Sequence, residues 1–223
     1  MELSLKEEFF LLVYDDLKGR AVISGNKFLY SLAGAVLLEL AHKEKISVRE
    51  KYVFVNSYKS SGDIVLDQIM EQIRKSPKNK KIKYWVNKLG RKGNILRKAI
   101  LAKMVSDSIY RKENYKVMGF FNCSRYYNRK PGYKEELEKN ILRMVFEDHG
   151  INEKLFMLVS LIGTSGLVRK MYICPLERRY AKRKIKEMTK KSDFGSAINE
   201  VIASTNAAII TAIATSAAAT PGS

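Results

Sequence analysis

The sequence predicts a mainly α-helical protein that folds as a single globular domain over residues 1–223, with a core of apolar helices and small β ribbons. Its 223 residues fit one domain, and a composition of 46% apolar and 29% charged residues is typical of globular proteins. Apolar residues recur at helical spacing in most segments. Segments that alternate or are rich in β formers are few and short, so we expect strands only as ribbons.

The first quarter of the chain combines two helices with short strands. Ser4 and Glu7 have the spacing of a capping box and predict a helix that begins just after Ser4. A wide apolar stripe over residues 28–42 predicts a second helix, central to the core. Residues 46–48 and 52–55 alternate as a strand pair does. The connections read as a turn at residues 15–19, a strand at 21–24 and a tight turn at Gly25-Asn26.

The next segment reads as three helices. Asp63 ends a Ser-Ser-Gly-Asp sequence that predicts the N-cap of a helix over residues 64–73, and Pro77 follows its end. Gly90 and Gly93 are expected to break the chain between two further helices, at residues 81–89 and 94–110.

The second half begins with a β-hairpin at about residues 115–130, which is rich in aromatic and β-forming residues. The segment after residue 200 lacks any charge, so a membrane anchor is one interpretation. Its many Thr, Ser, Asn and Ala residues favour a buried core helix instead. The helices are expected at residues 133–147, 153–167, 175–191 and 194 or 197 to 219, with a frayed tail at 220–223.

Positive charge is concentrated in two segments. Lys and Arg number 41 against 23 Asp and Glu, a net charge of +18. Residues 74–103 hold 12 of these cations and no acidic residue, and residues 169–191 hold 10 cations against two acidic residues. Such blocks favour an anionic partner, namely nucleic acid, a phospholipid surface or an acidic peptide. General lysine enrichment, 28 against 13 arginines, is the alternative without function, but it does not explain 30 residues free of acid.

Residues that catalysis would need are scarce. The two histidines, His42 and His149, are both expected at helix ends, and no Gly-x-Ser-x-Gly sequence is present. The adjacent residues 147–149 point in different directions around a helix, which does not suit a metal. We therefore expect no enzyme activity, no metal and no cofactor. Two cysteines, Cys123 and Cys174, are too few for a disulfide scaffold and indicate a reducing compartment.

Several stretches of the sequence are similar to one protein family. They are residues 4–8 (SLKEE), 32–41 (LAGAVLLELA), 61–67 (SGDIVLD) and 84–86 (YWV). In these residues the chain resembles the Golgi phosphoprotein 3 family, most specifically over residues 4–67. It shows no long polar arm of the kind that precedes the domain in eukaryotic relatives, so we expect a divergent or prokaryotic-type member.

The resemblance implies a fold, a function and partners. Family members are mostly α-helical domains with a protruding β-hairpin, and they are peripheral membrane proteins, not enzymes. Eukaryotic members bind phosphatidylinositol 4-phosphate and the short cytoplasmic tails of glycosyltransferases. We therefore expect a cytoplasmic adaptor that associates reversibly with the cytoplasmic face of a membrane by binding anionic phospholipid. The hairpin implies a homo-oligomer, with self-association residues Val117, Phe120, Phe121 and Tyr126.

The resemblance also places a lipid headgroup site. The family uses a Trp ahead of the second helix, an Arg before the glycine of that helix, and two Arg on a later helix. The corresponding positions here are Ser24, Ala33, Asn94 and Arg97, of which Arg97 alone keeps the family's residue. Arginine offers a fork of donors that asparagine and alanine cannot replace. We therefore expect a diffuse anionic-lipid surface in which Arg97 is joined by Lys27, Arg91, Lys92 and Lys98.

The same lysines fit other classes of partner. A basic surface binds the backbone of nucleic acid with a steep salt dependence, so a nucleic-acid-binding protein is the alternative function. A scaffold that holds acidic protein segments is a third interpretation. Residues 178–191 would serve any of these functions as a second basic face.

Overall fold

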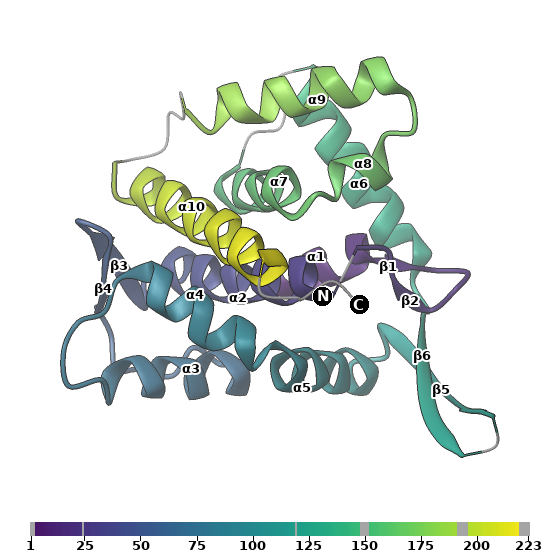
Figure 1. Cartoon of the computed structure of the whole chain (residues 1–223), viewed down its shortest axis with the longest axis horizontal. Helices are drawn as coiled ribbons and strands as arrows, with labels where there is room; N and C mark the ends of the chain where they lie inside the picture. The colour runs from purple at the N-terminus through teal and green to yellow at the C-terminus, as the bar shows by residue number, and fades with distance from the viewer. Residues whose placement is uncertain (1–2, 24, 119, 148–151, 191–195, 219–223) are drawn as a thin grey trace.

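The structure packs its other helices around the central helix α2 (Gly25–His42), and the longest of the described helices, α10 (Ser196–Ala218), lies across it (Figure 1). It is a computed structural model and describes residues 3–23, 25–118, 120–147, 152–190 and 196–218. The helices in these ranges are α1 (Leu5–Val13), α2 (Gly25–His42), α3 (Ile64–Arg74), α4 (Ile82–Arg91), α5 (Gly93–Ser106), α6 (Pro131–Phe146), α7 (Glu153–Ser165), α8 (Val168–Met171), α9 (Pro175–Met188) and α10 (Ser196–Ala218). This confirms the predicted mainly α-helical class.

The strands form three antiparallel two-stranded ribbons in the described ranges. They are β1 (Tyr14–Asp15) with β2 (Arg20–Ala21), β3 (Ile46–Arg49) with β4 (Tyr52–Val55), and β5 (Tyr110–Val117) with β6 (Phe121–Asn128). The predicted pair at residues 46–55 is confirmed. The strand predicted at residues 21–24 is wrong in extent, because the ladder with β1 ends at Ala21.

Helix α2 is the centre of the core. Every residue from 30 to 41 is buried, because α1, α4, α5, α7 and α10 pack around this helix. A helix that is apolar all round is stable only when it is covered in this way. Gly25 and Asn26, predicted as a tight turn, are instead the first two residues of α2. Asparagine is favoured at helix starts as well as in turns, so this sequence signal was ambiguous.

Gly90 does not break α4, in contrast to the prediction. It is buried within the helix, and a Cβ at this position would overlap the ring of Tyr30 in α2. Its missing side chain lets α4 lie directly against α2, which offsets the roughly 1 kcal/mol by which glycine disfavours a helix. The break comes at Lys92, which links α4 to α5.

The helix predicted at residues 94–110 ends earlier, at Ser106. Ser108 has a φ of +58°, a left-handed conformation that reverses the chain and starts β5 at Tyr110. The resulting hairpin protrudes from the helical body (Figure 1). At its base, the Tyr126 N–H donates to the Gly19 carbonyl at 3.0 Å. The hairpin therefore exists as predicted but begins five residues before position 115.

Helix α10 packs across α2, α4 and α7. Its buried side chains are Val201, Ile202, Thr205, Ala208, Ile209 and Ala212. By length and composition the stretch Asn199–Ala218 is able to cross a membrane, with a mean hydropathy of 1.5, and 33% of it is buried in the fold. The expected core helix thus covers the core with one face, and its other face is exposed. The tail at residues 220–223 lies outside the described ranges.

The capping box predicted at the start of α1 is confirmed. The Ser4 N–H donates to Glu7 Oε2 at 2.9 Å, and Glu7 also pairs with Lys103 of α5 at 2.9 Å. Lys103 in turn contacts Asp107 at 2.6 Å. Burial acts to raise the pKa of Glu7, but the Ser4 N–H and Lys103 outweigh it and hold that pKa below its usual value.

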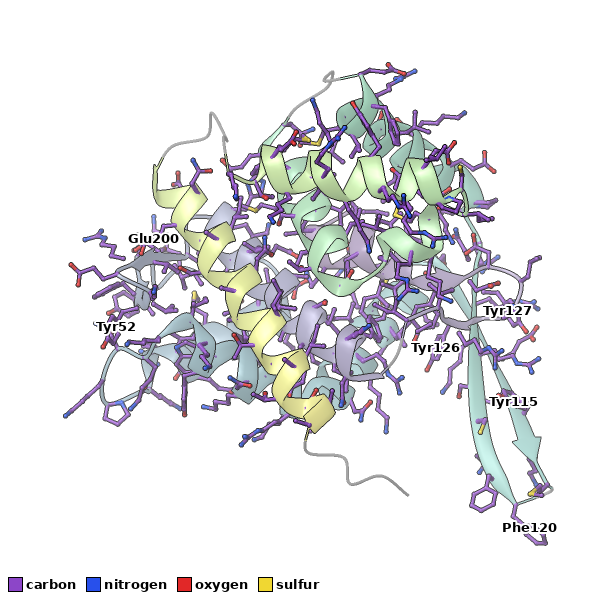
Figure 2. All side chains as sticks on the ribbon, turned by 45° about the horizontal axis from the view of Figure 1, so that its top comes forward. Tyr52, Tyr115, Phe120, Tyr126, Tyr127 and Glu200 are labelled. Carbon is purple, nitrogen blue, oxygen red and sulfur yellow. The ribbon has the colours of Figure 1, made fainter. Side chains whose placement is uncertain are left out.

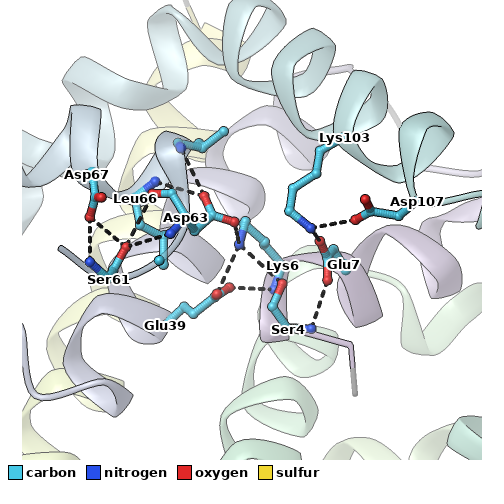
Figure 3. A network of polar contacts seen from close by, with 12 residues as sticks. Ser4, Lys6, Glu7, Glu39, Ser61, Asp63, Leu66, Asp67, Lys103 and Asp107 are labelled. Carbon is cyan, nitrogen blue, oxygen red and sulfur yellow. Dashed lines mark hydrogen bonds and ion pairs between the residues drawn. The ribbon is translucent and has the colours of Figure 1, made fainter. Parts of the chain in front are cut away.

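A buried charge cluster joins α1, α2 and α3 (Figure 3). Lys6 is fully buried, and its Nζ lies 2.9 Å from Glu39 Oε1 and 2.9 Å from Asp63 Oδ2. Asp63 also caps α3, as predicted, by accepting from the Val65 and Leu66 N–H groups at 2.9 and 3.1 Å. The cluster fixes the first helix against the central one through a charge that has no access to water.

Candidate anion-binding surface

The four positions that correspond to the family's headgroup site lie in different surroundings. Ala33 is fully buried in α2 and cannot contact a ligand at the surface. Asn94 is exposed in the first turn of α5, and Arg97 one turn later is half-buried. Ser24 lies outside the described residues. Only the two α5 positions therefore have side chains that the structure places near solvent.

Arg97 lies near Tyr14, the residue that follows α1. Burial raises the pKa of Tyr14 to about 12, and the positive charge of Arg97 opposes part of that rise. The Arg97 Nε is buried and has no hydrogen-bond partner in the described part of the chain. Part of its guanidinium is therefore buried rather than projecting freely into solvent.

The junction of α4 and α5 carries a compact group of exposed cations. We define the α4–α5 elbow as Arg91, Lys92 and Lys98, with Asn94 between them. Gly93 holds the elbow close to α2, because a Cβ at this position would lie 2.7 Å from Leu29 Cβ. Within the described ranges no carboxylate lies within 4.0 Å of these three cations. The elbow therefore presents unneutralised positive charge.

Helix α4 and the residues just before it add lysines that lie against aromatic rings. Lys88 Nζ lies 4.9 Å from the ring centre of Trp85 and 5.9 Å from that of Tyr84, and Lys80 approaches Tyr84 at 5.7 Å. Trp85 itself is buried in the core. Such cation–π contacts stabilise charge at the surface without neutralising it.

Helix α9 forms the predicted second basic face. Its inner side buries Ala181 and Ile185, and its outer side exposes cations. In Figure 1 α9 lies along one edge of the molecule, whereas α3 and α5 lie along the opposite edge and α4 lies between that edge and α10. The two basic segments of the sequence are therefore separate surfaces. The exposed cations of α9 include Arg179, Lys182, Arg183 and Lys186.

Lys27 does not belong to the elbow, in contrast to the single lipid surface expected from the family resemblance. Its side chain lies on the other side of α2, 3.8 Å from where a Cβ of residue 166 would be. Gly166 ends α7 with a φ of +83°, and this turn brings α8 next to the start of α2. Lys27 thereby lines a cavity of about 450 Å³, which we call the cationic hollow; its other lining residues are Val22, Ile23, Gly166, Arg169, Lys170 and Arg178.

The hairpin residues predicted to mediate self-association divide into two groups. Figure 2 shows Phe120 at the free end of the hairpin and Tyr126 at its base. Phe120 is 88% exposed and Phe121 is 66% exposed. Tyr126 packs edge-on against Tyr14, with ring centres 6.3 Å apart. The backbone of Val117 pairs with Phe121, and its side chain lies outside the described part.

Polar residues weighed for catalysis have structural partners. His42, at the end of α2, contacts Glu153 of α7 with 2.6 Å between Nδ1 and Oε1. Asp15 accepts from the Leu17 and Lys18 N–H groups, both at 2.9 Å. His149 lies outside the described residues.

A comparison with protein-family models finds a match for this chain. The model of the family described as Golgi phosphoprotein 3 (GPP34) matches residues 5–205. A comparison with curated proteins gives no match. The matched segment includes every helix from α1 to α9 and the first part of α10. The chain therefore belongs to the Golgi phosphoprotein 3 family.

Proposed function

We propose that this protein is a non-enzymatic peripheral adaptor that binds anionic phospholipid at the cytoplasmic face of a membrane. The observation that carries the proposal is the α4–α5 elbow, where three exposed cations have no carboxylate within 4.0 Å among the described residues. Each Lys or Arg near an anionic leaflet contributes about 1 kcal/mol to binding. The elbow and the neighbouring lysines of α4 are then sufficient for reversible association.

Family membership supports the choice of a membrane over other anions. The family's lipid, phosphatidylinositol 4-phosphate, is the ligand proposed for this chain as well. The positions Ser24 and Ala33 do not offer the family's side chains, so binding depends more on charge density than on a fork of arginines. Cytoplasmic tails of membrane enzymes such as glycosyltransferases are the proposed protein partners, and the exposed hairpin end is the proposed surface for homo-oligomers.

Vesicle co-sedimentation tests the proposal. Three vesicle types are compared: neutral ones, ones with a generic anionic lipid, and ones of matched charge that contain phosphatidylinositol 4-phosphate. We expect binding to both anionic types, with a fraction bound that falls between 0.05 and 0.3 M salt, over which the Debye length shrinks from more than 10 Å to less than 8 Å. A preference for the inositol lipid at matched charge supports a specific headgroup contact.

A matched pair of variants locates the binding surface. Arg91→Gln/Lys92→Gln removes two elbow charges, and Lys75→Gln/Lys78→Gln removes two exposed charges at the end of α3 and in the connection that follows. The elbow pair is expected to reduce vesicle binding about tenfold more than the other pair. Absence of wild-type binding at low salt contradicts the proposal, and tight binding of DNA or RNA at 0.15 M salt then favours the nucleic-acid alternative.

A further inference from the structure

The cationic hollow concentrates positive charge from three helices, of which α2 lies far from α8 and α9 in the sequence. Its cations are Lys27 in the first turn of α2, Arg169 and Lys170 in α8, and Arg178 in α9. Among the residues that the structure describes, no Asp or Glu lines it. Across the described ranges, no carboxylate lies within 4.0 Å of any of the four. Like charges gathered in this way repel one another, so the arrangement favours an anionic ligand between them.

Part of the hollow is held in place before any ligand arrives. The Arg178 Nε donates to the Tyr172 carbonyl at 3.1 Å, and its Nη2 donates to the Ile173 carbonyl at 2.8 Å. The guanidinium is therefore fixed in direction while its charge stays unneutralised. The left-handed turn at Gly166 leaves open the space beside Lys27 that a side chain would occupy.

The N-terminal end of α2, where the helix dipole is positive, also favours an anion in the hollow. Lys27 lies in the first turn of this 18-residue helix, where unpaired N–H groups and the helix dipole favour an anion. On the far side, Lys170 and Val22 also line a second cavity that contains Asp15, Asp16 and Glu138. Those carboxylates repel an anion, so the favoured position is on the side of Lys27 and Arg169.

We propose that the cationic hollow binds a ligand with two phosphate groups joined by a small polar linker, either as a lipid headgroup or as a free molecule. A phosphomonoester carries about −1.5 to −2 charge and a phosphodiester −1, which together match most of four cations. A cavity of about 450 Å³ lies within the usual range for small ligands. Val22 and Ile23 supply an apolar wall for the carbon skeleton. In its lipid form this inference rests on the proposed function.

The hollow is distinct from the α4–α5 elbow. It is built from the start of α2 and the residues before it, the turn that follows α7, and the helices α8 and α9, whereas the elbow joins α4 to α5 on the other side of α2. Lipid binding in the hollow and membrane binding at the elbow can therefore be removed by different mutations. Each of the two proposals can then fail without the other.

Isothermal titration calorimetry with inositol 1,4-bisphosphate and with inorganic pyrophosphate tests the hollow directly. The variant Arg169→Gln/Lys170→Gln removes two of its cations, and Lys182→Gln/Lys186→Gln removes two exposed cations of α9 outside it. Loss of one charge-assisted hydrogen bond to phosphate weakens binding about tenfold or more. We expect at least that loss for the hollow variant and less than about threefold for the control. Lys27→Gln, from a different helix, is expected to repeat the loss.

The same proteins are then tested on vesicles that contain phosphatidylinositol 4-phosphate. Loss of both the soluble ligand and the lipid in the hollow variant supports a headgroup site. Loss of the soluble ligand alone supports a site for a free phosphorylated molecule. Equal weakening by the hollow and control variants, or no binding of either soluble probe by the wild type, overturns the hollow. Vesicle binding by the wild type in that case leaves the proposed function standing.

Discussion

Lys6 is the residue on which the N-terminal packing depends most. Its ammonium group is fully buried between Glu39 and Asp63. Replacement by methionine keeps most of the side-chain volume but leaves two carboxylates without their cation. Removal of one partner from a buried ion pair costs about 3–5 kcal/mol, because an uncompensated charge stays in the core. We expect Lys6→Met to lower the free energy of unfolding by that amount, measured by urea denaturation followed by circular dichroism.

An exposed ion pair provides the control for Lys6. Arg74 contacts Glu71 one turn earlier on α3, and both side chains are largely in water. Exposed pairs contribute little to stability. Arg74→Met is therefore expected to leave the urea midpoint nearly unchanged. Similar midpoints for the two variants would show that the buried cluster is not needed for stability.

The buried cluster also predicts a pH dependence. Burial acts to raise the pKa of Asp63, but the hydrogen bond and charge of Lys6 and the N–H groups at the start of α3 outweigh it, so the folded-state pKa lies below the usual value. The unfolded-state pKa is about 3.9. This contribution to stability is thus present above about pH 4 and is lost as pH falls through the folded-state pKa.

The pH profile of Lys6→Met is expected to differ in a defined way. Without the lysine, Asp63 loses the cation that lowers its pKa, so its protonation costs less stability in the variant than in the wild type. The stability gap between wild type and Lys6→Met should therefore narrow from pH 7 to pH 3, measured as urea midpoints in a pH series. A gap that stays constant over this range contradicts the role assigned to Lys6.

At the scale of elements, the contact between α4 and α2 depends on Gly90. A Cβ here overlaps the Tyr30 ring, which is packed in the core. Gly90→Ala is expected to destabilise the protein by about 1–3 kcal/mol through overpacking, even though alanine favours a helix. Gly132→Ala in α6 meets no atom within 4 Å and is expected to be neutral or slightly stabilising. Thermal denaturation of both variants measures the difference.

The hairpin is the element expected to govern self-association. Its free end exposes Phe120 and Phe121, and exposed aromatic groups of this size are typical of contact surfaces. We expect Phe120→Ser/Phe121→Ser to shift the protein toward monomer in sedimentation velocity. The control Ile173→Ser/Leu176→Ser removes two equally exposed apolar residues near α9 and is expected to leave the distribution unchanged. If the two variants show the same distribution of monomer and oligomer, the hairpin does not mediate self-association.

Local signals predicted most elements, and tertiary contacts explain the errors. The capping box at Ser4 and the cap at Asp63 were predicted because each depends on a few neighbouring residues. Gly90 was misassigned because its conformation is decided by Tyr30, sixty residues earlier in the chain. The four-residue helix α8 is too short to produce a periodic pattern and was not predicted.

At the scale of the whole molecule, the parts of the site that are continuous in sequence were predicted, and the parts that tertiary contacts assemble were not. Charge counts predicted the basic elbow and the basic face of α9, since both are continuous in sequence. The cationic hollow was missed because it joins Lys27 to Arg169, residues far apart in the chain that Gly166 brings together. The burial of Ala33 follows from the wide apolar stripe over residues 28–42, which predicted a helix central to the core.

The overall charge arrangement leads to a last prediction. The elbow and α9 lie on opposite edges of the molecule (Figure 1), so one molecule can contact two anionic surfaces at once. Wild-type protein is therefore expected to cluster anionic vesicles, which light scattering measures. Two triple variants each leave one basic surface intact: the α9 variant Arg179→Gln/Lys182→Gln/Lys186→Gln and the elbow variant Arg91→Gln/Lys92→Gln/Lys98→Gln. Each substitution removes about 1 kcal/mol of membrane-binding free energy. Each triple variant should abolish clustering, and the elbow variant should also bind vesicles more weakly, through α9 alone. Binding without clustering by the wild type would instead assign the membrane contact to one face.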